Sequence, residues 1–321
     1  MKTLRMTLVA AAAVMAAGAV SAQTTIRITH ATPATSHYGV GTQAFCAELE
    51  KRSNARFKCQ IQPNTGDERA SIEGVQLGSL DATNTSTGPV SNFVPEVGIV
   101  DIPFLFRDYA HARGVLDGPI GQELLARFPA RGLIALAWTE NGFRHMTNSR
   151  RAVVKPEDVR GLKVRTMQNP VHIQAFQSIG VQPTPMAFSE LFTALQQGVV
   201  DGQENPIPVI LSSKFSQVQK HLSLTGHVYS PAVLLLSPAL WNKLNDADKA
   251  MFRESARVAA AAQRKKVNDD EASGIAQLRS EGVEVVTNVD GNAFRTAMAP
   301  VFAEFAKKFG ADNIKRIQDF R

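Results

Sequence analysis

Gly161-Leu-Lys-Val-Arg165-Thr-Met-Gln168-Asn169-Pro170 is the stretch from which the fold can be predicted. Leu162–Val164 has the pattern of a short strand, with a glycine before it and Asn169-Pro170 after it. Proline suits the first position of a helix, so Arg165 is predicted at the carboxyl end of a strand, just ahead of a helix. In open α/β sheets ligands bind outside the carboxyl ends of the strands. A guanidinium there offers two parallel donors that match a carboxylate.

A second stretch, Val200-Asp-Gly-Gln203-Glu204-Asn205-Pro206, repeats this arrangement. Val199-Val200 is strand-like and leads to two amides and a carboxylate ahead of a proline. Arg165 alone could be a solvated arginine at a strand end. The polar side chains that follow both strands favour a ligand site, in which Gln168 and Asn169 could bond the same ligand as Arg165.

The rest of the chain alternates predicted strands and helices, which favours an α/β fold with parallel, helix-covered sheets. The expected strands are 25–30, 57–61, 80–83, 133–138 and 163–165, and the expected helices are 39–53, 68–77, 172–179 and 189–197. Asn245 and Asp248 form an N-cap signal for a helix that could run to about Ser280. A helix of that length exceeds the width of one lobe. No flexible linker is evident, so ordered segments should join the lobes.

The N-terminus has the pattern of a secretory signal peptide. Lys2 and Arg5 precede an alanine-rich apolar run from Thr7 to Val20, and Val20-Ser21-Ala22 is a small-residue cleavage site. A membrane anchor is the weaker alternative, because the run is short for a bilayer. We therefore expect cleavage after Ala22 and export to the periplasm, leaving about 300 residues, enough for two lobes.

Charge and motifs argue against several function classes. The formal charge of +6 falls to about +4 when Lys2 and Arg5 leave, and the basic residues are scattered, so nucleic-acid binding is not expected. Gly39-Val-Gly41-Thr-Gln-Ala44 matches a dinucleotide fingerprint but lies too far after its strand, so close helix packing is the better interpretation. The chain has no Gly-x-Ser-x-Gly elbow and no zinc-binding helix motif. We expect no cofactor and no metal site.

Cys46 and Cys59 are the only cysteines. Cys46 falls in a helical run and Cys59 in the alternating strand 57–61. Export and an even count favour a disulfide between them. The alternative is a pair of small buried apolar side chains.

Several motifs together resemble one protein family. "GLKVRTMQNP", "GVQPTPMAFSELFTALQQGVVDGQENP", "GFRHMTNSRR", "NTGDERASIEGVQLGSLDATNTS" and "DIPFLFRDYAHARGVLDG" are similar to the solute-binding proteins of TRAP (tripartite ATP-independent periplasmic) transporters, of the DctP type. The resemblance runs from about Thr25 to the C-terminal helices. It implies a two-lobed periplasmic binding protein in which each lobe is a helix-covered sheet and a long helix backs both.

The resemblance also implies roles for individual residues. Arg144 lies where the family has a second ligand-facing arginine, and Asn205 resembles an asparagine that bonds the ligand carboxylate. Glu68 matches an acidic position that contacts ligand hydroxyls or amines in sialic-acid-binding members. Ser86 stands where those members have a glutamate, which argues against sialic acid. The loop after the first strand usually faces the cleft, so His30 is interpreted as part of a polar wall rather than as a metal ligand.

These observations predict a binding protein, not an enzyme, that works as a monomer and delivers a small organic acid to TRAP membrane permease subunits. Polar residues such as Glu68, Ser86, Thr87 and His30 favour a sugar acid, either a uronate or an aldonate. A C4-dicarboxylate is the second choice, since Arg144 could take a second carboxylate. A periplasmic enzyme on acidic sugars and a binding protein for an ATP-driven transporter are further alternatives. The expected first lobe is 23–141 plus about 231–270, and the second is 142–230 plus about 271–321.

Overall fold

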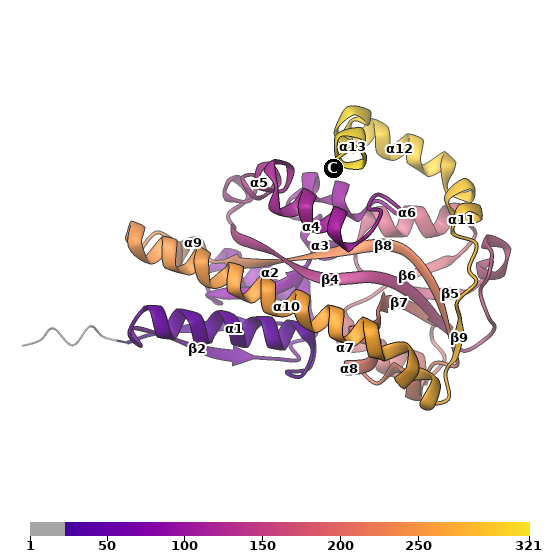
Figure 1. The fold of residues 1–321 in the computed structure, drawn as a ribbon, viewed down its shortest axis with the longest axis horizontal. Helices are drawn as coiled ribbons and strands as arrows, with labels where there is room; N and C mark the ends of the chain where they lie inside the picture. Colours follow the sequence, from indigo (N-terminus) through magenta and orange to yellow (C-terminus); the bar gives the residue numbers. More distant parts are fainter. Residues whose placement is uncertain (1–22) are drawn as a thin grey trace, which may run out of the picture.

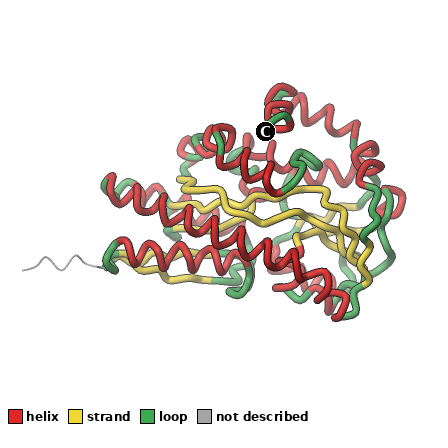
Figure 2. The backbone as a smooth tube through the Cα atoms, in the orientation of Figure 1, coloured by secondary structure: helices red, strands yellow, loops and turns green. Residues whose placement is uncertain are grey.

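A computed structural model describes residues 23–321, and the predicted signal peptide, residues 1–22, lies outside the described residues. Within the described part, nine strands form one sheet in the order β2-β1-β3-β8-β4-β7-β5-β6, with β9 beside β8 (Figures 1 and 2). The strands are β1 (Thr24–Thr29), β2 (Phe57–Gln62), β3 (Ala82–Ser86), β4 (Ile134–Asn148), β5 (Lys163–Thr166), β6 (Gln182–Pro185), β7 (Gly202–Pro206), β8 (His221–Leu236) and β9 (Glu284–Val286). The mixed α/β fold confirms the predicted fold class.

Two long strands, β4 and β8, run through both halves of the sheet. The sequence pattern predicted only 133–138 of the first and did not predict the second. The two strands pair antiparallel along almost their whole length, so that the first half of each lies beside the second half of the other. The shorter strands attach in parallel pairs, with β1 beside β2 and β3 on one side and β5 beside β6 and β7 on the other. The prediction of parallel sheets was therefore only partly right, because β4 and β8 join the two parallel units as antiparallel neighbours.

Helices cover both faces of this sheet. They are α1 (His37–Arg52), α2 (Glu68–Leu77), α3 (Thr87–Val90), α4 (Tyr109–Asp117), α5 (Pro119–Leu125), α6 (Pro170–Ser178), α7 (Phe188–Gln196), α8 (Ile207–Ser212), α9 (Pro238–Trp241), α10 (Asp246–Ser280), α11 (Gly291–Ala297), α12 (Ala299–Phe309) and α13 (Ala311–Gln318). Short 3-10 helices cover Pro95–Asp101 (η1), Pro129–Arg131, Pro156–Val159 and Phe215–Gln217. The boundary predicted between the lobes, 141/142, falls inside β4.

The long helix α10 confirms the predicted element that backs both halves. Asn245 caps it by accepting a hydrogen bond from the backbone N–H of Asp248 at 2.8 Å. Its 35 residues span about 52 Å, and they pack against α1 at one end and against α8 and β9 at the other (Figure 1). A Cβ on Gly41 would lie 2.4 Å from Oε1 of Gln263 on α10. This close contact supports the helix-packing interpretation at Gly41, whereas a Cβ on Gly39 would meet the backbone of Ala34 in the loop before α1.

Three apolar clusters stabilise the two faces of the sheet. One lies under α1 and α10 and contains Phe45, Leu234 and Phe252. A second lies under α7 and α8, and the largest fills the opposite face beneath α4, α6 and α12. The last helix, α13, pairs with α5 through Arg316 and Glu123. The C-terminal segment thus contacts residues of the expected first lobe as well as the second.

Cys46 of α1 and Cys59 of β2 form a disulfide, as predicted, with their Cα atoms 5.6 Å apart. It joins the first helix to the outermost strand, β2, on the edge of the sheet. Because it closes a loop with a sequence separation of 13, it should stabilise the fold mainly by restricting the unfolded chain.

We expect the double substitution Cys46→Ser/Cys59→Ser to lower the free energy of unfolding by about 2–3 kcal/mol, measured by urea denaturation. A reductant should lower the unfolding midpoint of the natural protein to a similar extent and leave that of the double variant unchanged. A natural protein whose midpoint does not respond to reductant would contradict the prediction.

Candidate ligand-binding site

A small cavity lies where the carboxyl ends of β1, β3, β5 and β7 come together. Its first wall is formed by Ala31, Thr32, Tyr38, Glu68 and Ser86; its second wall is formed by Arg165, Met167, Phe188, Asn205 and Val209, with Asn141 of β4 between them. The cavity volume is about 20 Å³, room for about one water molecule. A larger groove of about 740 Å³ between α5 and α10 contains none of the residues predicted to bind a ligand.

Arg165 of β5 is a buried cation on the second wall, only 2% exposed. Its Nε and Nη2 donate to the carbonyl oxygen of Met186 at 3.2 and 2.8 Å, and the guanidinium lies 5.8 Å from the ring centre of Phe188. Burial lowers the pKa of Arg165 to about 10, so the side chain is charged at neutral pH. Its Nη1 has no hydrogen-bond partner, and no carboxylate pairs with it, among residues 23–321.

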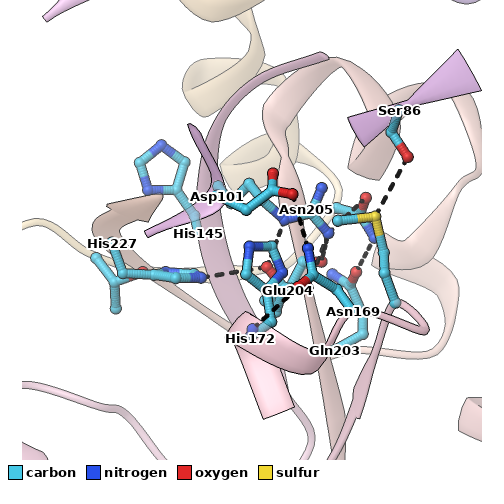
Figure 3. Close-up of polar contacts among 12 residues, drawn as sticks. Ser86, Asp101, His145, Asn169, His172, Gln203, Glu204, Asn205 and His227 are labelled. Atoms are coloured by element: carbon cyan, nitrogen blue, oxygen red, sulfur yellow. Dashed lines mark hydrogen bonds and ion pairs between the residues drawn. The ribbon is translucent and has the colours of Figure 1, made fainter. Parts of the chain in front are cut away.

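Arg144 of β4, by contrast, donates two of its guanidinium nitrogens to a buried carboxylate. Its Nε donates to Oε2 of Glu204 at 2.5 Å, and its Nη2 donates to Oε1 of Glu204 at 2.8 Å and to Oδ1 of Asn205 at 3.3 Å. His227 Nε2 lies 3.2 Å from the same carboxylate (Figure 3). Burial raises the pKa of Glu204, but the charge of Arg144 and the hydrogen bonds from His227 and Arg144 outweigh it and hold this pKa well below its usual range.

This pairing limits what Arg144 can offer a ligand. Only its Nη1 lacks a hydrogen-bond partner within the described chain, so Arg144 cannot present two nitrogens to a second ligand carboxylate. Asn205 lies in front of it, on the second wall, and its Nδ2 donates to Oε1 of Gln203 at 2.5 Å. The β5–β7 pairing sets Arg165 beside Gln203, which brings Arg165 and Asn205 to the same cavity.

On the first wall, Glu68 and Ser86 form a hydrogen-bonded pair. Oε1 of Glu68 accepts from the backbone N–H of Ser86 at 2.7 Å and from its hydroxyl at 2.8 Å. Thr85 donates to the same oxygen at 3.0 Å. Tyr38 lies beside this pair with a buried hydroxyl that finds no partner in the described part of the chain.

Five residues that the sequence placed near the ligand are not in the cavity lining: Arg144, which is paired with Glu204, and Asn169, Thr87, Gln168 and His30. Asn169 caps α6, accepting from Val171 N at 2.8 Å, and donates to Asp101 at 2.9 Å (Figure 3). Thr87 donates to Asp101 at 2.6 Å, and Gln168 is bonded only through its backbone carbonyl, by Asn92 at 2.7 Å. His30 lies behind the first wall, 3.5 Å from the hydroxyl of Thr32. The side chains of Asn169 and Thr87 thus bond the buried Asp101 instead of lining the cavity.

The strand positions were also partly wrong. Val199 and Val200 precede β7, and Gln203, Glu204 and Asn205 belong to the strand itself. Tyr38, Met167 and Phe188 line the cavity without having been singled out. Tyr38 and Phe188 stand in the first turns of α1 and α7, and an aromatic residue just after a polar loop is the sequence signal that could have identified them.

The two walls touch each other at several points around the cavity. Ser189 N donates to Gly66 O at 3.1 Å at the start of α7, and Asn92 and Asp101 reach Gln168 and Asn169 from η1 and the turn before it. These contacts hold the walls together with little free space between them.

A family model described as "Bacterial extracellular solute-binding protein, family 7" (DctP) matches residues 28–308. The chain belongs to this family. The resemblance read from its motifs is thereby confirmed. No helix in residues 23–321 is long and apolar enough to span a membrane.

Solved members of the DctP family superimpose closely on this chain. A TRAP periplasmic solute-binding protein from Polaromonas sp. JS666, bound to D-erythronate, is 63% identical with a TM-score of 0.92, covering 93% of this chain and 99% of its own. One from Bordetella bronchiseptica, with density assigned to pantoate, is 52% identical with a TM-score of 0.92, covering 93% and 100%. The sugar-acid-binding DctPAm of Advenella mimigardefordensis, in complex with galactonate, is 35% identical with a TM-score of 0.89, covering 93% and 97%.

Four histidines lie near the site and its supporting strands; His30, His37 and His172 are buried, and His145 is partly buried. Burial lowers the pKa of His30 to about 4 and the pKa values of His37, His145 and His172 to about 3. In the unfolded chain each would take up a proton near pH 6.5. The unfolded state therefore binds more protons between about pH 6.5 and 4, and these groups make the fold less stable as the pH falls through that window.

Two buried carboxyls act in the opposite direction. Burial raises the pKa of both Asp101 and Glu271 to about 7, so in the folded protein they hold protons that the unfolded chain takes up only near pH 4. Each adds stability as the pH falls from 7 to 4. With four histidines against two carboxyls, the unfolded state binds about two more protons than the folded state in this pH range.

We expect the free energy of unfolding to fall by about 2 kcal/mol between pH 6 and pH 5, measured by urea denaturation at both pH values. His145→Gln, whose amide oxygen can replace the acceptor for the backbone N–H of Gly226, should reduce this fall by about half. Equal or greater stability at pH 5 would show that the histidines are not held neutral.

Proposed function

We propose that this protein is the substrate-binding subunit of a TRAP transporter and captures a small hydroxylated monocarboxylate, with Arg165 as the partner of the carboxylate. The buried charge of Arg165 carries this proposal. A charge taken out of water is costly unless an opposite charge is paired with it, and the open face of the guanidinium, Nη1, lies on a cavity wall. An anionic ligand in that cavity supplies the missing counter-charge.

Further donors converge on the same place. Arg144 has one free nitrogen, Nη1, behind Asn205, and Asn205 itself lies on the second wall beside Arg165. A carboxylate with two oxygens accepts about four hydrogen bonds, which these three side chains can provide. The first wall supplies Tyr38 and the Glu68–Ser86 pair for ligand hydroxyls.

A monocarboxylate is favoured over a dicarboxylate by the Arg144–Glu204 pair. Glu204 occupies Nε and Nη2 of Arg144, and Arg165 is the only arginine in the cavity lining. One unmatched guanidinium calls for one ligand carboxylate. Among sugar acids, an aldonate is the first choice, since the 63% identical Polaromonas protein binds D-erythronate. A uronate remains the second member of the same ligand class.

Capture would require the two walls to part, since the cavity is nearly filled, and then to close over the ligand through bending where β4 and β8 cross between the halves. The expected lobes, 23–141 with 231–270 and 142–230 with 271–321, meet at this crossing. Export after cleavage at Ala22 would bring the protein to the periplasm, where the loaded form passes the acid to membrane permease subunits.

The alternative of a periplasmic enzyme on acidic sugars needs an acid or base poised over the substrate. Glu68 is the one carboxylate in the lining, and its oxygens already accept from Thr85 and Ser86. Incubation with aldonates and uronates followed by mass analysis should return every acid unchanged. A new product mass would favour the enzyme instead.

We expect Arg165→Ala to abolish measurable binding of D-erythronate while the protein stays folded. The loss of the buried charge partner should cost roughly 3–5 kcal/mol, or at least about a hundredfold in affinity, measured by titration calorimetry. Arg165→Lys should restore little, because a lysine ammonium cannot reproduce the planar guanidinium that donates to Met186 O on one edge and leaves Nη1 for the ligand.

Arg160→Ala is the matched control, since Arg160 is an exposed arginine five positions earlier in the chain. It should bind like the natural protein. Near-normal affinity in Arg165→Ala, together with loss in Arg160→Ala, would mean that the site has been assigned to the wrong residues.

A thermal-shift panel of aldonates, uronates, C4-dicarboxylates and the matching neutral sugars tests the ligand class, because a ligand that binds only the folded state raises the unfolding temperature. We expect the largest shift with an aldonate and none with neutral sugars. Shifts with neutral sugars but not with acids would overturn the proposed clamp, and shifts with dicarboxylates alone would restore the second choice.

A further inference from the structure

Met167 is a side chain of the second wall that reaches across to the first. It follows β5 two positions after Arg165 and is only 4% exposed. Its Sδ lies 3.4 Å from the hydroxyl oxygen of Ser86 (Figure 3), whose proton is donated to Glu68. The thioether therefore bridges the cavity at the end of β3.

The far end of Met167 fits against a glycine of α3. A Cβ on Gly88 would lie 2.7 Å from Cε of Met167 and 2.8 Å from its Sδ, closer than real Cβ contacts. The absence of a side chain at position 88 thus makes the room into which the methionine tip extends. Together with the Ser86 contact, it fixes where Met167 lies.

Met167 also lies close to Arg165, the residue proposed to bind the ligand carboxylate. Two residues of extended chain span about 7 Å, and Met167 is the second residue after Arg165, one position beyond the end of β5. Arg165 and Met167 both line the cavity, so a chain that starts at the guanidinium meets the thioether within one short ligand length. The cavity left between them is about 20 Å³.

We infer that Met167 sets the upper length of the ligand, admitting a four-carbon hydroxy acid and excluding six-carbon acids. This rests on the proposed function, and it narrows the ligand class of that site. A six-carbon aldonate adds two carbons and two hydroxyls to a four-carbon one. Replacing Met167 by alanine removes three non-hydrogen atoms from the same region, which provides comparable room.

Calorimetric titration of the full mature chain with D-erythronate and with galactonate tests the inference. The natural protein should bind D-erythronate at least a hundredfold more tightly than galactonate. In Met167→Ala, galactonate should gain at least tenfold while D-erythronate changes less than tenfold. Met251→Ala, the same substitution at a partly buried residue of α10, should leave both affinities unchanged.

The outcomes separate this inference from the function on which it rests. If the natural protein binds no organic acid, the proposed function fails and the inference with it. If it binds both acids equally, or if Met167→Ala still binds D-erythronate but gains nothing for galactonate, only the length limit is overturned. Should Met167→Ala not fold, Met167→Val, which also removes the Sδ and Cε atoms that touch Gly88, must show the same gain for galactonate or the inference is wrong.

Discussion

A guanidinium buried without a carboxylate is the constraint on which this account depends. Arg165 is held by one carbonyl oxygen and faces a cavity with its remaining nitrogen. Burial lowers its pKa only to about 10, so the charge persists at neutral pH. Burying such a charge is costly unless an opposite charge is paired with it. Arg165 reaches this position because it lies near the carboxyl end of β5.

Arg144 is a second buried arginine in the same sheet, and unlike Arg165 it is paired with a carboxylate. It carries its own counter-charge, Glu204, on the neighbouring strand β7, and His227 of β8 joins the pair. The pair ties β4, β7 and β8 together just behind Asn205. Arg144 thus has its counter-charge within the sheet, whereas Arg165 has no carboxylate partner among residues 23–321. The difference between the two arginines lies in the position of one glutamate.

Sequence reasoning identified the family, the long helix, the disulfide and the meeting of Arg165 with Asn205. Local signals sufficed there: a strand end before a proline, an asparagine cap, and two cysteines in adjacent elements. It missed the length of β4 and the whole of β8, because the pairing of these two strands is set by each other across the molecule rather than by local pattern. It also assigned Asn169 and Thr87 to the ligand, whereas both bond the buried Asp101, and no local pattern distinguishes these two uses of a polar side chain.

The most direct test of the central claim compares a ligand with and without its charge in the natural protein. Calorimetric titration with D-erythronate and with its amide, erythronamide, keeps size and hydroxyl groups the same and removes only the negative charge. If the charge of Arg165 pairs with the ligand carboxylate, the amide should bind at least about a hundredfold more weakly. Equal affinity for acid and amide would contradict the account, because the buried charge would then play no part in binding.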